Sequence, residues 1–140
     1  MFVPAPPRFS AMLEFYAKRE GQLQELTSAE PNCWINIAPP FSQEELEEIA
    51  LRYDIPLDFL TDSLDVDERS RYEREDQVKL ILLNTPVINE IDRENESIYI
   101  TVPIGIVLTP ENIITISAYE SPVLDMFFDG KVKNFSTEDH

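Results

Sequence analysis

The sequence has few of the residues on which most enzymes depend. Of its 140 residues, one is cysteine (Cys33), one is histidine (His140) and three are glycine. The single cysteine excludes an internal disulfide and fits a reducing compartment. The only histidine ends the chain, so no Ser-His or Cys-His pair can be assembled around it. Three glycines are too few for a phosphate-binding loop. We therefore expect a protein that is not an enzyme.

Basic residues and long apolar runs are also scarce. Lys and Arg total 11 against 27 Asp and Glu, a net charge of −16. Such a chain repels phosphate backbones, which argues against nucleic acid and favours metal cations or a basic protein as ligands. The longest apolar stretches, 80–83 and 104–108, fall far short of the ~18 residues that span a bilayer. Residues 1–7 lack the basic and apolar regions of a signal peptide, so we expect a soluble chain.

The residues that are present predict one folded domain. Apolar residues make up 43% of the chain, which is too rich for a disordered segment, and the length suits a single domain with its own core. Neither a repeat nor a Gly/Ser linker divides it. We expect one domain over residues 1–140, with an ordered core from about 9 to 129.

Short apolar segments with turn residues between them predict the strands. Residues 13–18 and 22–27 flank Arg19-Glu20-Gly21 as a hairpin. The next strand is predicted at 33–37, and Pro39-Pro40 ends it, since proline cannot donate to a sheet ladder. Pro103 and Gly105 predict a bend or a sheet edge, and the polar stretch 89–97 predicts a loop. The remaining strands are expected at 78–88, 98–102 and 113–117.

Three helices are expected from capping residues and apolar spacing. Ser42 and Glu45 form a capping box, after which Leu46, Ile49, Ala50 and Tyr53 repeat on one face. Proline suits a first helical turn, which places helices at 56–64 and 121–128. Strands and helices together predict an α/β fold, a mixed sheet layered with helices as an α/β/α sandwich.

The apolar phase of each element predicts its buried side chains. The residues expected in the core are Trp34, Leu46, Ile49, Leu60, Leu82, Ile100 and Ile114. Cys33 is expected to be a buried, inert thiol. The polar tail from Gly130 to His140 is expected to fray.

Acidic residues concentrate in the middle of the chain. Residues 42–76 hold 13 acids and 4 bases, and Asp62, Asp65, Asp67 and Glu68 fall within seven positions. Carboxylates at this density suit a hard cation with oxygen ligands. The spacing does not make an EF-hand, because a serine stands where the loop needs glycine. The alternative interpretation is that the nearby arginines, Arg69, Arg71 and Arg74, pair with these acids on a solvated loop.

Five segments in one order resemble the N-terminal domain of the CorA family of magnesium and cobalt transporters. That family shows a WI-[DN] strand, a capped helix, an L-x-D-x-L-[DN] turn, an R-x-[KR]-x-E run and a later strand. The corresponding residues here are 34–37 (WINI), 40–46 (PFSQEEL), 55–66 (IPLDFLTDSLDV), 68–73 (ERSRYE) and 113–116 (IITI). The resemblance extends from Leu13 to Phe128.

The resemblance implies the cytoplasmic, metal-sensing domain of a pentameric channel at the inner membrane. The family's stalk helix, two membrane helices and Gly-Met-Asn signature are absent from these residues. Asp62 falls on the family's regulatory carboxylate, which binds Mg²⁺ together with a neighbouring subunit; Thr61 departs from an acid that some members carry. Asp62 is expected to be exposed at the end of its helix, because Leu60 and Leu64 on either side of it should face the core. Asp65 and Asp67 are expected in the outer shell. Co²⁺ or Zn²⁺ are alternative cations, and the isolated domain is expected to be monomeric or weakly associated.

Two other functions remain open from the residues alone. One is an acidic module that binds a basic protein. The other is a carboxylate hydrolase, which would need a cleft holding two acids roughly 5–9 Å apart.

Overall fold

The structure, a computed structural model, describes residues 12–89, 98–132 and Thr137. Its strands form one seven-stranded sheet in the order β2-β1-β3-β7-β6-β5-β4. The helices are α1 (Gln43–Tyr53), α2 (Leu57–Asp62) and α3 (Pro122–Phe128). The strands are β1 (Met12–Arg19), β2 (Gln22–Leu26), β3 (Trp34–Ala38), β4 (Arg71–Glu75), β5 (Val78–Asn89), β6 (Ile98–Leu108) and β7 (Ile113–Ile116).

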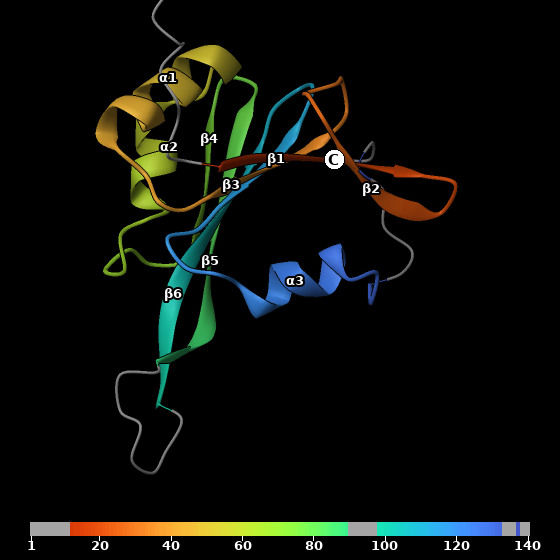
Figure 1. The fold of residues 1–140 in the computed structure, drawn as a ribbon. Coiled ribbons are helices and arrows are strands. Elements are labelled where there is room, and N and C mark those ends of the chain that lie inside the picture. The colour runs from red at the N-terminus through yellow and green to blue at the C-terminus, as the bar shows by residue number, and fades with distance from the viewer. Residues whose placement is uncertain (1–11, 90–97, 133–136, 138–140) are drawn as a thin grey trace, which may run out of the picture.

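The sheet is mixed and layered, as the sequence predicts. β3 pairs with β7 in parallel, and the other neighbours are antiparallel. Helices α1 and α2 cover one face of the sheet and α3 lies on the other (Figure 1). Because successive side chains of a strand point to opposite faces, Ile35 and Ile37 meet the first two helices, whereas Trp34 meets Phe127 and Phe128 of α3. The predicted α/β/α arrangement is confirmed.

The turn and cap signals act where the sequence places them. Glu20 and Gly21 adopt positive φ angles of 54° and 77° between β1 and β2, the conformation that tight hairpins prefer. Ser42 Oγ accepts from the Glu45 N–H at 3.2 Å and so caps α1. Asp54 ends the helix in the left-handed region, and its N–H donates to the Ala50 carbonyl.

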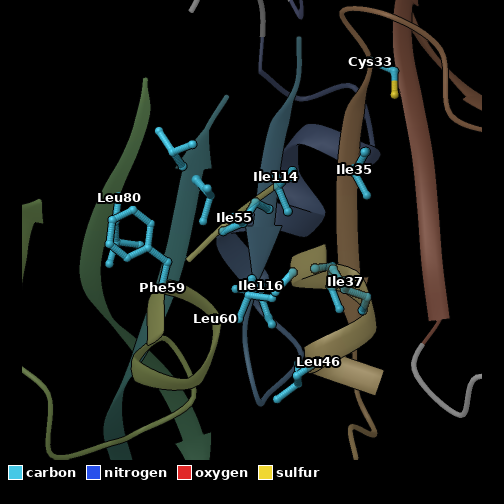
Figure 2. Packing of buried hydrophobic residues seen from close by; sticks show 14 residues of the cluster. Cys33, Ile35, Ile37, Leu46, Ile55, Phe59, Leu60, Leu80, Ile114 and Ile116 are labelled. Atoms are coloured by element: carbon cyan, nitrogen blue, oxygen red, sulfur yellow. The ribbon is translucent and has the colours of Figure 1, made fainter. Parts of the chain in front are cut away.

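The core lies between the sheet and helices α1 and α2 (Figure 2). Leu46, Phe59 and Leu60 of the helices belong to one buried cluster with isoleucines of β3 and β7 and with Leu80 of β5. Of the seven side chains predicted to be buried, six are buried, and Cys33 is buried as well. Ile100 is half-buried. It lies in the part of β6 that pairs with β5 but not with β7, so fewer neighbours cover it.

One strand is absent from the sequence prediction. β4 pairs with β5 at the edge of the sheet, although one interpretation of the sequence places its arginines on a solvated loop. Four of its five residues are charged, which gives no apolar alternation to recognise. Charged side chains suit an edge strand because they discourage pairing with another chain.

The predicted bend or edge at Pro103 and Gly105 is half right. β7 pairs with β6 only from Gly105 to Leu108, so among the described strands none pairs with Pro103 on that side, and its missing N–H breaks no ladder bond. Gly105, in contrast, lies inside the sheet between β5 and β7. A Cβ atom there would lie 1.9 Å from Ser63 Oγ, so the glycine lets the end of α2 approach the sheet.

Two further expectations fall largely outside the described residues. The loop predicted at 89–97 is one of them, although Asn89 itself belongs to β5. The other is the frayed tail. Within it, Thr137 is buried and accepts a hydrogen bond from the Lys18 N–H at 3.4 Å.

Replacing Leu46 by alanine should lower the free energy of unfolding by about 2–5 kcal/mol, because a fully buried leucine leaves a cavity. Leu51 on the same helix is 84% exposed and provides the matched control. Its change to alanine should cost less than about 0.5 kcal/mol. Urea unfolding of both variants measures the difference, and equal losses would mean that α1 faces the sheet differently.

The variant Gly105→Ala should lose about 1–3 kcal/mol, because the new methyl group overlaps Ser63. Ser63→Gly should remove the overlap, so the same alanine should cost less in that background. A double-mutant cycle of unfolding free energies measures the coupling. Additive losses would show that the two residues do not meet.

Candidate functional site

Asp62, the carboxylate singled out by the sequence, is the last residue of α2. Phe59 and Leu60 of the same helix are completely buried. Ser63 Oγ donates to the Phe59 carbonyl at 2.6 Å. The turn that carries Asp62 is therefore fixed by the core. The sequence predicts an exposed carboxylate, but the side chain is only 29% exposed, because Arg71 of β4 lies against it.

Arg71 holds three carboxylates at once. Its Nη2 contacts Asp62 Oδ2 at 2.7 Å and its Nη1 contacts Glu68 Oε2 at 2.5 Å. Its Nε contacts Glu73 Oε2 at 3.3 Å. Desolvation lowers the pKa of Arg71, but the hydrogen bonds to the three acids outweigh it, and the net shift is upward. The guanidinium stays charged, and one positive charge against three carboxylates leaves two negative charges uncompensated.

Asp65 and Asp67 lie on the exposed turn that follows α2. Asp65 Oδ1 accepts a hydrogen bond from the Asp67 N–H at 2.9 Å. This local bond shapes the turn. Of the arginines expected to pair with the acids, Arg71 does so, whereas Arg74 donates to the backbone carbonyl of Asp76.

The arrangement supplies only part of a metal site. Within residues 12–89 and 98–132, no three His, Cys, Asp or Glu side chains gather closely enough to hold a metal ion. Asp62 could offer one carboxylate oxygen, and a cation there would compete with Arg71 for it. Magnesium keeps several waters and needs only one or two carboxylates. The donors present therefore fit a shared magnesium site and not an enclosed one.

Two hollows on the surface escaped the sequence analysis. The larger, about 650 Å³, lies between three turns, and Asp54, Asp76 and Thr109 are among its lining residues. The smaller, about 380 Å³, lies beside α3, and Glu14 and Asp125 are among its lining residues. Both are built from segments far apart in the sequence. Asp54 and Asp76 have positive φ angles of 54° and 53°, so each lies in a turn, but the sequence around either residue does not show that the turns meet.

Comparison with solved structures finds proteins that share this fold. No protein-family model and no curated protein sequence matches the chain. The complete CorA magnesium transporter of Methanocaldococcus jannaschii matches 84% of this chain and 36% of its own, with a TM-score of 0.66 and 20% identity. The soluble domain of CorA from the same organism matches 88% of this chain and 47% of its own, with a TM-score of 0.65 and 19% identity.

These matches show that the chain has the fold of the CorA soluble domain, which confirms the fold expected from the sequence resemblance. The chain spans less than half the length of either matched protein. Both neighbours are a transporter or its domain, and neither is described as an enzyme. Among the described residues, no helix is long and apolar enough to cross a membrane.

Replacing Arg71 by glutamine should lower the free energy of unfolding by about 1–2 kcal/mol, because three carboxylates then lack a counter-charge. The loss should shrink at high salt, since salt screens their mutual repulsion. Arg52, which pairs with Glu48 on exposed α1, is the control; its change to glutamine should cost no more than about 0.5 kcal/mol. Urea unfolding at low and high salt measures both, and a salt-independent loss would show that Arg71 acts through packing.

Proposed function

We propose that this chain is the metal-sensing domain of a CorA-like divalent-cation transporter, acting at the cytoplasmic face of the cell membrane. The observation that carries the proposal is the shared fold with the CorA soluble domain over 88% of this chain. In this proposal the domain works within a longer homopentameric protein that also has stalk and membrane helices. Ion conduction belongs to those other parts, and this domain reports the cation concentration to them.

Asp62 is the proposed regulatory ligand. Its helix is anchored in the core while its carboxylate remains partly exposed at the surface, which suits a ligand that meets a second subunit. Asp65 and Asp67 on the neighbouring turn would receive hydrogen bonds from metal-bound waters. A cation bridging two acidic subunits stabilises the closed assembly and dissociates when its concentration falls.

Within the chain, the guanidinium of Arg71 is a cation that would compete with the metal ion for Asp62. Without metal, Arg71 neutralises Asp62 at 2.7 Å. When a cation binds Asp62, Arg71 still retains Glu68 and Glu73, so its charge stays compensated. Because the metal cation must displace Arg71 from Asp62, its affinity for the site is lowered. A sensor of an abundant ion requires such weak binding.

The available ligands favour Mg²⁺ over Zn²⁺, with Co²⁺ as an alternative. Zinc prefers thiolate and imidazole ligands. Cys33 is completely buried, and burial raises the pKa of its thiol, so it stays protonated. The acids around α2 offer only oxygen, the donor that magnesium prefers.

An acidic module that binds a basic protein is the second candidate. The net charge of −16 favours it, together with hollows lined by acids. Salt-sensitive capture of a basic protein without any dependence on metal would distinguish this function from cation sensing.

The test is a chimera in which this chain replaces the matching region of the M. jannaschii transporter. Protease protection is measured across a magnesium titration. Asp62→Asn should raise the midpoint about tenfold, equivalent to about 1.4 kcal/mol of binding free energy. Arg71→Gln should lower the midpoint, because it removes the competing cation.

Asp58→Asn is the matched control and should leave the midpoint unchanged, since Asp58 is exposed on the same helix. Identical midpoints for wild type and Asp62→Asn would contradict the sensing role. The isolated chain should show little magnesium stabilisation, because a ligand stabilises only as RT ln(1 + [L]/Kd) and half a site binds weakly.

A further inference from the structure

The smaller hollow lies on the face of the sheet that α3 covers. Its volume of about 380 Å³ falls within the range of about 300–1,000 Å³ typical of ligand pockets. It is formed by β1, β3, the turn after β3, the segment between β7 and α3, and one side of α3. Its lining includes Glu14, Asn36, Pro39, Glu120, Asp125 and Phe128.

A carboxylate is held in a fixed position at this hollow. Glu14 Oε2 accepts from the Tyr16 hydroxyl at 3.0 Å, and Glu14 Oε1 accepts from Asn36 Nδ2 at 2.9 Å. Thr115 Oγ1 in turn donates to Asn36 Oδ1 at 2.7 Å, and Trp34 Nε1 donates to Thr115 Oγ1 at 2.8 Å. This chain of hydrogen bonds crosses β1, β3 and β7, so the carboxylate is oriented before any ligand arrives.

The carboxylate lacks a positive partner within the described residues. Glu14 is half-buried, and none of the ion pairs there involves it. The hollow is lined by two further acids and by no Lys or Arg. Burial, and next the bond to Glu14, raise the pKa of Tyr16, so its hydroxyl stays protonated and keeps donating. A half-buried charge with only neutral donors favours the arrival of a cation.

The size and spacing of the acids favour an organic cation over a metal ion. In the described part of the chain, no three acidic side chains come close enough to coordinate one ion. A planar guanidinium can instead reach separated carboxylates, and it is less strongly hydrated than an ammonium group. It also packs favourably against aromatic rings such as Phe128.

We propose that this hollow binds an arginine side chain of a partner protein. Glu14 would accept two parallel hydrogen bonds from the guanidinium, with Glu120 and Asp125 adding attraction at the rim. The surroundings indicate a protein as the source, because Tyr119 in the lining and Val123 and Met126 on α3 are 42–47% exposed, and aromatic and methionine side chains are enriched in protein interfaces. This inference does not depend on the sensing role of Asp62.

The experiment titrates the chain with the peptide acetyl-Gly-Arg-Gly-amide and follows NMR shifts of the Asn36 side-chain amide. The same peptide with citrulline, which has the shape of arginine without its charge, should bind at least about tenfold more weakly. Glu14→Gln should weaken binding of the arginine peptide by a similar factor, whereas Glu47→Gln on the exposed face of α1 should leave this binding unchanged. If Glu14→Gln does not fold, Asp125→Asn replaces it and should weaken binding about threefold.

Three results would overturn the inference. One is the absence of a saturable shift with the arginine peptide. Another is equal affinity where a difference is expected, either between the arginine and citrulline peptides or between the wild type and the folded acid variant. The third is tighter binding of free arginine than of the peptide, which would identify a small-molecule pocket and not a docking surface.

Discussion

The close approach of α2 to the sheet is the constraint on which the rest of the structure depends. At Gly105 the absence of a side chain leaves room for Ser63, whose hydroxyl closes the last turn of α2 onto Phe59. That contact brings Phe59 and Leu60 into the core and sets Asp62 at the surface next to β4. A larger residue at position 105 would move the helix, and with it the carboxylate.

The negative charge of the chain is handled differently on the two faces of the sheet. On the side of α2, Arg71 compensates part of the charge of three carboxylates. On the side of α3, Glu14 is oriented by Tyr16 and Asn36, which are neutral donors. In the two proposals, a metal cation takes the place of Arg71 at Asp62 in the first arrangement, and a partner supplies a cation to Glu14 in the second. The same acidic composition therefore supports two separate proposals.

The candidate site was only partly predictable from the sequence. Asp62 could be singled out because its place in the turn resembles the family pattern, and its position at the end of α2 is confirmed. Its partner could not be identified, because Arg71 lies on a strand whose charged residues give no apolar period. The pairing of these residues depends on how β4 adds to the edge of the sheet. Whether Asp62 binds a cation remains a prediction.

The sequence by itself determined the elements whose signals are local. The capping box at Ser42, the turn at Gly21, the helix-starting prolines and the apolar phase of each element act within a few residues, so the hairpin, the helices and six of the seven predicted core positions followed from them. Only the tertiary structure decided what depends on distant segments. The parallel pairing of β3 with β7, the ion pairs of Arg71 and the hollow at Glu14 each join residues that the chain separates. Their formation depends on packing across the whole sheet, and no short stretch of sequence encodes that.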